Sequence, residues 1–435
     1  MGWQILYVQL INFGIAFLAS KLRPLPGSSD GRYNMGQMPA TRVAILDVLR
    51  GAAVAGMILV TSSGDWNQAY PFLQHAGWNG WTLADMVFPM FLFAVGMAMG
   101  LSFPRRLSAP GALTGLWWRV GRRVTLLLFL GLLVNAIYTA DILGIPVNLG
   151  QPGIDFVRIP GVLQRIALCY LAAMALVLGF PRQTAEGDFD VNPRTMIVAI
   201  MAILMLYWLL MRFVPVPGYG TGALDQEGNL AAYIDRAIFT VPHLWPLGTA
   251  GSGGPVVFDP EGLLSTLPAI TNTLFGILAA LAWRRSPERA VPRMAIIAAA
   301  LGALALLLDP VFPINKKIWT SSFALLSAAF SFMALACLAW ALKRRWVERL
   351  SAPLKILGSN AVLAFLLATI FSKLADAPWF GMDGARLTAQ AWGNAIARKL
   401  LPDAHMAATA CALGILGMIT LILWPLYRRK LHFRL

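Results

Sequence analysis

A short polar segment before a strongly apolar run holds the residues best suited to chemistry. It contains His75, followed by Asn79, Thr82 and Asp85. Imidazole is the side chain best suited to proton transfer near neutral pH. The Thr-x-x-Asp spacing of Thr82 and Asp85 is typical of a capping box, so we expect a helix to begin there. Two interpretations remain open. The residues form a catalytic site, or His75 is an ordinary solvated loop histidine and Asp85 only caps the helix.

Pro89 stands four residues after Asp85 and removes one helical hydrogen bond, so we expect the helix to bend beside that aspartate. The amino end of a helix also favours negative charge and could hold a developing oxyanion. A bent, capped helix end beside His75 is therefore a candidate polar site.

Asp47 and Arg50 are a second candidate pair, three residues apart inside an apolar run. An ionisable group inside a membrane costs on the order of 3 kcal/mol, which makes it a functional candidate. The two side chains share one helix face, where they can neutralise each other. An ion pair that joins two helices explains them as well as catalysis does.

Three further polar pairs stand at the starts of apolar runs: Gln164 and Arg165 at the entry of one, and Asp259 and Glu261, and Asn315 and Lys316, each shortly before another. Any one pair alone is explained by helix capping or interfacial anchoring. Because all three fall on the same predicted side as His75, we expect a shared pocket.

The composition indicates that the elements carrying these residues cross a membrane, since 58% of the residues are hydrophobic and only 13% charged, with a mean hydropathy of +0.66. Runs of the length needed to cross a hydrocarbon core of about 30 Å recur along the chain. We predict an all-α, polytopic membrane helical bundle with ten core transmembrane helices, at Ile45–Ser62, Leu83–Phe103, Val124–Tyr138, Val162–Phe180, Met196–Val214, Leu264–Trp283, Met294–Leu308, Trp319–Leu342, Ile356–Leu374 and Ala408–Tyr427.

The basic residues predict the orientation of this bundle. The side that holds the start of the first run receives about three times as many Lys and Arg as the other, which predicts that it is cytoplasmic. We expect a multi-pass protein of a bacterial inner membrane with a cytoplasmic C-terminus. The net charge of +15 does not indicate a nucleic-acid partner, because the basic residues lie in short clusters between apolar runs.

Two parts are expected along the chain. Residues 1–41 form a hydrophobic segment and linker, with Ile5–Ala19 as a possible eleventh helix or a stretch upstream of a start at Met35 or Met38. Residues 42–435 form the transmembrane domain. Its two longest exterior loops, Pro215–Gly262 and Ala375–His405, could roof a cavity, and the second could carry a short surface helix.

Neither a metal site nor a disulfide framework is expected. The three cysteines, Cys169, Cys337 and Cys411, all lie inside apolar runs and lack the spacing of either, so we interpret them as small core residues. Gly96 and Gly100 form a small-xxx-small pair that predicts close helix packing.

The motifs together resemble the heparan-alpha-glucosaminide N-acetyltransferase family, within the transmembrane acyltransferase superfamily. The likeness runs from about Arg42 to the C-terminus and rests on Leu46–Gly51, His75–Thr82 with Asp85–Pro89, Pro160–Arg165, Asp259–Gly262 and Asn315–Lys316. The family often has an asparagine where this chain has Thr61, which leaves a second polar helper there in doubt.

The resemblance implies transfer of an acetyl group from cytoplasmic acetyl-CoA to the amine of a glucosamine-type sugar on the periplasmic side. His75 is the implied key residue, acting either as a base or as a nucleophile that is acetylated first. Asp47 and Asp85 complete the catalytic candidates. The candidates for binding substrate are Arg50, Asn79, Gln164, Arg165, Glu261, Asn315 and Lys316.

Acetyl-CoA enters this reaction as a co-substrate, and no metal is required. The candidates for holding its phosphates, each of which is also explained as a topology anchor, are Arg119, Arg122, Arg123, Arg284 and Arg285. The family further implies a homodimer. Because the long luminal N-terminal domain of the lysosomal enzyme is not expected here, we favour free glucosamine, a chitosan-like oligomer or a cell-envelope amino sugar over heparan sulfate as acceptor. A transporter of N-acetylglucosamine or a related amino sugar is the alternative.

Overall fold

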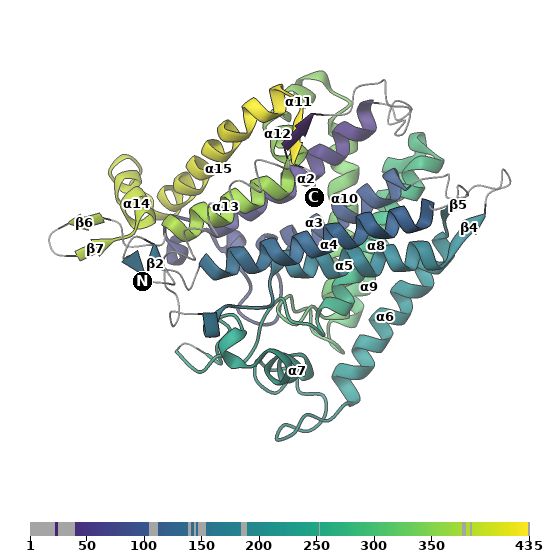
Figure 1. Ribbon diagram of the computed structural model, residues 1–435, viewed down its shortest axis with the longest axis horizontal. Coiled ribbons are helices and arrows are strands. Elements are labelled where there is room, and N and C mark those ends of the chain that lie inside the picture. Colours follow the sequence, from purple (N-terminus) through teal and green to yellow (C-terminus); the bar gives the residue numbers. More distant parts are fainter. Residues whose placement is uncertain are drawn as a thin grey trace.

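A computed structural model of the 435-residue chain describes residues 22–24, 40–103, 112–137, 141–142, 145–146, 154–183, 189–251, 253–375, 380–382 and 385–433. These residues form an all-α bundle (Figure 1). The expected helix at Ile5–Ala19 lies outside the described residues, as does most of the expected linker.

Eight helices in the described part of the chain are long and apolar enough to cross a membrane. They are α2 (Ala40–Thr61), α3 (Leu83–Ser102), α5 (Val162–Gly179), α6 (Pro193–Phe213), α8 (Thr266–Arg285), α9 (Ala290–Leu308), α10 (Ser321–Ala341) and α15 (Ala404–Arg428). The prediction of a polytopic helical bundle is therefore confirmed. Side chains that cap helix starts include Asn192, Thr320 and Asp403, each of which accepts a backbone N–H of the first turn.

The two other predicted spans differ from a simple crossing. The run at Val124–Tyr138 falls on α4 (Ala112–Ala136), whose first half carries three arginines and is therefore less apolar. The run at Ile356–Leu374 is broken into α12 (Ala352–Ser359) and α13 (Ala361–Ala375), which meet at 90°. A single helix was expected there, and Asn360 explains the break: its side chain bonds the backbone of Leu431 and Phe433 instead of continuing the helix.

The remaining elements are short and lie at the ends of the bundle. The expected surface helix in the loop at Ala375–His405 is α14 (Ala389–Leu400), and α7 (Leu230–Phe239) and α11 (Arg345–Leu350) are two further short helices. Among the described residues, 3-10 turns cover Trp66–Gln68, Pro71–Leu73, Ile154–Phe156, Val241–His243 and Pro287–Arg289. Antiparallel strand pairs are β1 (Leu22–Pro24) with β8 (Leu431–Phe433), β2 (Asp141–Ile142) with β3 (Ile145–Pro146), β4 (Pro181–Gln183) with β5 (Phe189–Val191), and β6 (Phe380–Met382) with β7 (Ala385–Leu387).

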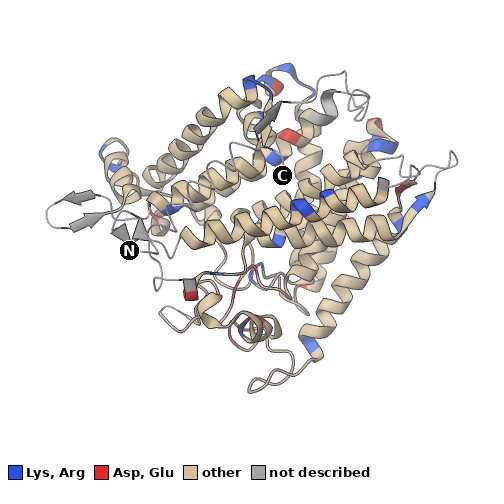
Figure 2. Ribbon diagram, in the orientation of Figure 1, with Lys and Arg blue, Asp and Glu red and all other residues tan. Residues whose placement is uncertain are grey.

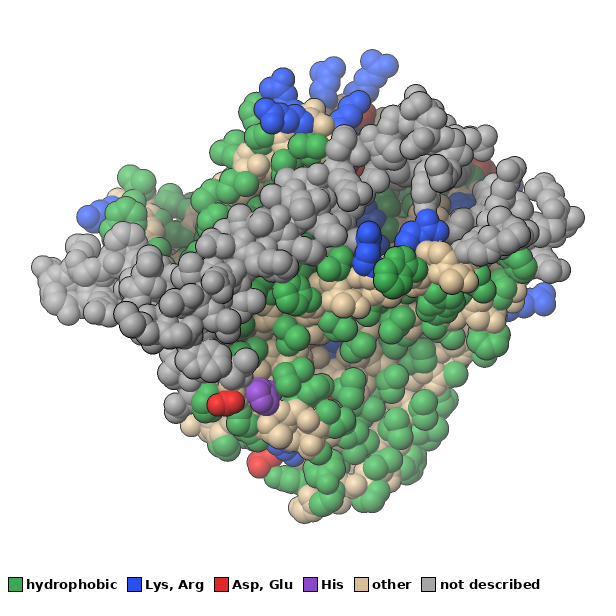
Figure 3. All heavy atoms as spheres, viewed as in Figure 1, with side chains coloured by type: hydrophobic (Ala, Val, Ile, Leu, Met, Phe, Trp, Pro, Cys, Tyr) green, Lys and Arg blue, Asp and Glu red, His purple; other side chains and the backbone are tan. Residues whose placement is uncertain are grey.

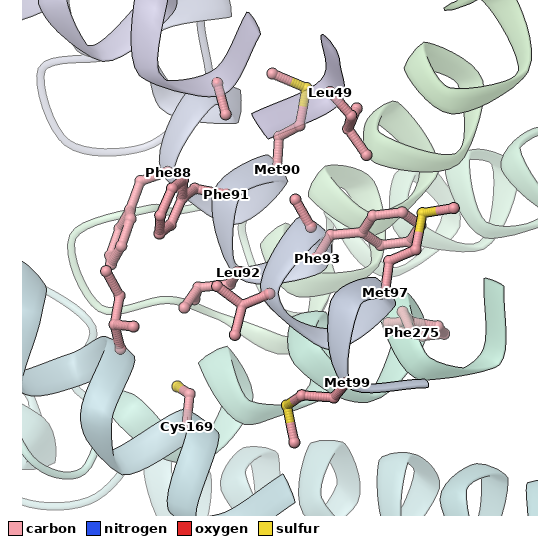
Figure 4. Close-up of a cluster of buried hydrophobic side chains, with 14 of the residues drawn as sticks. Leu49, Phe88, Met90, Phe91, Leu92, Phe93, Met97, Met99, Cys169 and Phe275 are labelled. Atoms are coloured by element: carbon pink, nitrogen blue, oxygen red, sulfur yellow. The ribbon is translucent and has the colours of Figure 1, made fainter. Parts of the chain in front are cut away.

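The core is built around α3, which packs closely against α8. A Cβ atom on Gly96 would lie 1.8 Å from the carbonyl oxygen of Thr273, and one on Gly276 would lie 2.0 Å from that of Phe93. Glycine is therefore needed for the two backbones to approach, as the small-residue spacing predicted. Aromatic and methionine side chains of α3 fill the space beside this contact (Figure 4).

The surface agrees with burial in a bilayer. The middles of the long helices carry few charges (Figure 2), and hydrophobic side chains cover much of the face over α4, α5 and α6 (Figure 3). Cys169 is buried, as expected of a small core residue, and Cys411 is partly buried. The interpretation of Cys337 as a core residue was wrong, because it is exposed on the outer face of α10, where apolar side chains face lipid.

Candidate active site

The centre of the candidate site is a hydrogen-bonded pair of His75 and Asp85. Nδ1 of His75 lies 2.8 Å from Oδ1 of Asp85, whose side chain is 1% exposed, while that of His75 is 39% exposed. The other carboxylate oxygen accepts the backbone N–H groups of Ala76 (3.2 Å) and Thr82 (2.9 Å). The contact with Thr82 is the reciprocal half of the predicted capping box. Asp85 therefore both caps the helix and aligns the imidazole of His75. A carboxylate on Nδ1 fixes the tautomer in which Nε2 is the proton acceptor.

Lys316 stands beside this pair from the loop between α9 and α10. Its Nζ lies 3.0 Å from Nδ1 and 3.2 Å from Nε2 of His75, and 3.6 Å from Oδ1 of Asp85. Burial and, second, the charge of Lys316 lower the pKa of His75, so the imidazole is neutral at neutral pH. Burial likewise lowers the pKa of Lys316. A neutral imidazole is the form that a general base or a nucleophile requires.

Asn79 and Asn315 fix the position of Lys316 relative to His75. The amide of Asn315 donates to Oδ1 of Asn79 (3.1 Å), and the N–H of Gly80 donates to the carbonyl of Ile314 (2.8 Å). Asn315 is fully buried, and its side-chain oxygen also accepts the N–H of Ile318 (3.1 Å). Both predicted binding residues therefore fasten the two loops together.

A layer of arginines and carboxylates lies next to this cluster. Arg158 binds Asp259, with Nε 2.8 Å from Oδ2, and also Glu261. Burial opposes ionisation of Glu261, but the charges of Arg158, Arg165 and Lys316 outweigh it and hold its pKa below the ordinary value. The sequence interpretation missed Arg158. Two observations could have indicated it: this loop arginine stands seven residues before Arg165, and the loop acids Asp259 and Glu261 needed a basic partner.

Arg165 has the most unusual environment of this layer. Its side chain is 1% exposed and donates from Nη2 to the carbonyl of Gly262 (3.1 Å) and to Ser265, while Nε and Nη1 have no hydrogen-bond partner. The guanidinium lies 5.0 Å from the ring centroid of Trp319. Gln164, its neighbour, donates to the carbonyl of Ile159 (3.0 Å). Buried unpaired donors are costly in a folded protein, which suggests that a ligand oxygen completes them.

Asp235 of α7 supports the same loop from the other side and was also missed as a site residue. It is buried, accepts the N–H of Leu263 (2.8 Å) and packs so closely on Gly262 that a Cβ there would lie 1.8 Å from its carboxylate. Burial raises the pKa of Asp235 to about 7. The backbone that provides the Gly262 carbonyl to Arg165 is thus held by a readily protonated acid.

The structure does not bring Asp47 and Arg50 to His75. Their side chains are 3.7 Å apart, and Arg50 lies near Ser102 and Phe103, where α3 ends, whereas Asp85 lies in its first turn. Seventeen residues of helix separate Asp85 from Ser102, which corresponds to about 26 Å.

A cavity of about 290 Å³ runs from the Arg50 level toward the level of His75 and, on α3, ends at Phe91, six residues before Asp85 is reached. Arg50 and Arg123 line it at one end, and it follows α3 from Phe103 to Phe91, a rise of about 18 Å. At its inner end it is also lined by Ile166, next to Arg165 in the chain. Nε of Arg123 is buried without a partner. The cavity thus has room for a ligand at the Arg50 end, and its lining includes Ile166 but not Arg165 itself.

The other predicted phosphate-binding arginines surround the Arg50 end of the bundle. Arg119 and Arg122 are exposed on α4, and Arg285 is exposed at the end of α8. Arg284 is bound by Asp190 (3.1 Å) and the carbonyl of Gly100 (3.2 Å). Of the five candidates, Arg123 alone lines the cavity.

Comparisons with known proteins agree with the motifs. The family model described as heparan-alpha-glucosaminide N-acetyltransferase, catalytic, matches residues 42–308, which include His75, Asp85, Arg165 and Glu261. The chain is 30% identical to the heparan-alpha-glucosaminide N-acetyltransferase of Mus musculus over 355 residues, covering 74% of this chain and 52% of the mouse protein. It is 26% identical to that of Homo sapiens over 453 residues, covering 96% of this chain and 63% of the human protein. The chain thus spans between half and two thirds of the length of these relatives.

Proposed function

The chain belongs to the heparan-alpha-glucosaminide N-acetyltransferase family, and from that premise we propose that it transfers an acetyl group from acetyl-CoA to the amine of a glucosamine-type sugar across a membrane. The observation that carries this proposal is the His75–Asp85 pair, 2.8 Å apart, at the amino end of α3. The acceptor is free glucosamine, an amino-sugar oligomer or an envelope amino sugar.

In direct transfer, the acceptor nitrogen attacks the thioester carbonyl carbon while Nε2 of His75 takes a proton from that nitrogen. Asp85 stabilises the imidazolium that forms. The tetrahedral intermediate then collapses: its carbon–sulfur bond breaks, and the CoA sulfur takes the proton from His75. The two unpaired N–H groups of Arg165 are suited to hold the oxyanion of that intermediate.

In the alternative, Nε2 attacks the thioester carbonyl carbon, the carbon–sulfur bond breaks, and CoA leaves as the thiolate while the acetyl group stays on Nε2. The amine then attacks this acetyl group, its bond to Nε2 breaks, and the proton that the amine loses balances the one that the thiolate takes up. The same hydrogen bond to Asp85 supports either step. Incubation with radiolabelled acetyl-CoA in the absence of an acceptor separates the two: label retained by the wild-type protein, and lost in His75→Ala, indicates the acetylated histidine.

The cavity along α3 supports entry of the donor from the Arg50 end. The Arg50 end carries the arginine clusters predicted to be cytoplasmic, so acetyl-CoA enters there, with Arg123 as the phosphate-binding candidate that lines the entrance. The acceptor meets His75 from the opposite face, which is periplasmic in a bacterial inner membrane, and the C-terminus lies on the cytoplasmic side.

The test is acetyl transfer from labelled acetyl-CoA to glucosamine by the purified protein in liposomes, comparing wild type, His75→Ala and His405→Ala. His405 is a matched control because its ring binds the carbonyl of Gln68 (2.8 Å) and stacks on Tyr70. We expect product from wild type and the control only. Equal product from His75→Ala removes this residue from the mechanism. Uptake of labelled N-acetylglucosamine by wild type without acetyl transfer supports the transporter instead.

A further inference from the structure

A second hollow lies on the outer face of the bundle, between α9 and α10, and belongs to neither the His75 site nor the cavity along α3. Its volume is about 210 Å³, and only apolar side chains line it, among them Trp81, Met86, Ala299, Leu326, Phe330 and Met333. From Leu326 to Met333 it follows α10 for about 10 Å. We call it the α9–α10 groove.

This groove faces the bilayer. Only 17% of the α9 span is buried inside the protein, and Phe330 and Met333 are 36% and 41% exposed. Because α9 and α10 both cross the membrane, the groove opens into hydrocarbon, where an alkyl chain is the available occupant.

Two residues that line the groove, Trp81 and Met86, belong to the segment that carries Thr82 and Asp85. Trp81, 45% exposed, immediately precedes Thr82, and Met86 immediately follows Asp85. Gly80, next to Trp81, is bonded to the loop that carries Lys316. An alkyl chain in the groove would therefore have its polar head at the Trp81 end, on the same side of the membrane as His75, and Trp81 has the amphipathic ring typical of the membrane interface.

Resting on the proposed function, we propose that the acceptor is membrane-anchored: an amino sugar linked to an alkyl chain, with the chain in the α9–α10 groove and the amine at His75. A water-soluble sugar would make no use of an apolar groove that ends at the catalytic segment. The anchor also holds the amine at the membrane surface. The acceptor then meets the enzyme by diffusion within the bilayer plane, where its effective concentration is higher than in solution.

The kinetic test compares two acceptors with the same head, dodecyl glucosaminide and methyl glucosaminide, using the full chain in nanodiscs. Ala299→Phe fills the groove, and Ala300→Phe places the same ring on the adjacent exposed position of α9. The quantity compared is the ratio of the KM for the dodecyl acceptor to the KM for the methyl acceptor. We expect this ratio to be at least tenfold higher in Ala299→Phe than in wild type. Ala300→Phe changes the ratio less than twofold. An unchanged ratio in Ala299→Phe overturns the proposal.

A binding test that does not need turnover separates this proposal from the proposed function. Dodecyl glucosaminide with a diazirine at the end of its alkyl chain is photo-crosslinked to wild type, Ala299→Phe and His75→Ala, and the labelled peptides are identified by mass spectrometry. We expect label on the groove segments of α9 and α10 in wild type and His75→Ala, and its loss in Ala299→Phe. Label with no acetyl transfer refutes the proposed function but supports the groove.

Two results overturn the proposal. Label spread over all lipid-facing helices means that the probe behaves as ordinary boundary lipid. A smaller particle mass for Ala299→Phe than for wild type means that a second copy of the chain fills the groove.

Discussion

The Nζ of Lys316 lies 3.2 Å from Nε2 of His75, although 241 positions separate the two residues in the chain. It also lies 3.0 Å from Nδ1, so the cation stands against both ring nitrogens and next to the carboxylate that orients the ring. The positive charge of Lys316 keeps the imidazole neutral, and the carboxylate of Asp85 remains in place to stabilise the imidazolium that forms when His75 takes up a proton.

Lys316→Gln should move the acid limb of the kcat/KM profile to higher pH. Burial is the larger cause of the lowered pKa of His75, and the charge of Lys316 is the second. Removing that charge raises the pKa, so the neutral, active imidazole is lost at a higher pH. The measurement is acetyl transfer at a series of pH values, with Lys317→Gln, which leaves Lys316 in place, for comparison. An acid limb that stays in place, or moves to lower pH, contradicts the assignment.

Asp85→Asn should lower kcat by about 10²–10⁴-fold with little change in the KM for acetyl-CoA. An amide that donates to Nδ1 of His75 forces the proton onto Nε2, which can then no longer accept one. The amide oxygen can still accept the N–H groups of Ala76 and Thr82, so the loop is kept. Single-turnover rates and thermal unfolding of the same sample check this. A rate within twofold of wild type would show that Asp85 only caps α3.

Arg165→Lys should lower kcat by about 10²–10³-fold if its unpaired N–H groups hold the oxyanion. Lysine keeps the charge but cannot reproduce the planar fork. The readout is kcat and KM for acetyl-CoA measured separately, because a role in donor binding alone would raise KM and leave kcat unchanged. Arg158→Lys is the comparison: it disturbs the pairing with Asp259 and Glu261 and should lower thermal stability more than kcat.

Asp235→Asn should stabilise the protein above neutral pH. Burial raises the pKa of Asp235 from 3.8 to about 7, so its contribution to stability is complete below about pH 4 and is lost as the pH rises through 7. At pH 8 the loss is on the order of 4 kcal/mol, as an upper bound. We expect the unfolding midpoint in detergent to fall between pH 5 and pH 8 in wild type and to fall less in the variant. Asp225→Asn, at an exposed loop position, is the control. Parallel curves for Asp235→Asn and wild type would contradict the raised pKa.

Local patterns predicted the features that depend on neighbouring residues. The Thr82–Asp85 spacing identified the start of α3, and Gly96 identified a close helix contact, because both follow from helix geometry alone. The grouping of Asn315, Lys316 and His75 at one end was also predicted, since the side of the membrane follows from the order of the apolar runs.

The position of a residue across the membrane, and its contacts with residues far away in the chain, could not be predicted from local patterns. The spacing of Asp47 and Arg50 shows that they share a helix face, but not that they lie at the far end of α3 from His75. The break at Asn360 depends on β8, more than seventy residues away. The roles of Arg158 and Asp235 likewise depend on loops that meet only in the folded chain.

The strand β8 has a practical consequence for engineering the protein. Its backbone is held by Asn360, and Phe433 lines the cavity at the Arg50 end. An affinity tag or fluorescent fusion joined directly after this strand would stand at the rim of the proposed donor entrance. Such a fusion would compete with acetyl-CoA for access, and a cleavable linker or an insertion elsewhere would be the safer route to purification.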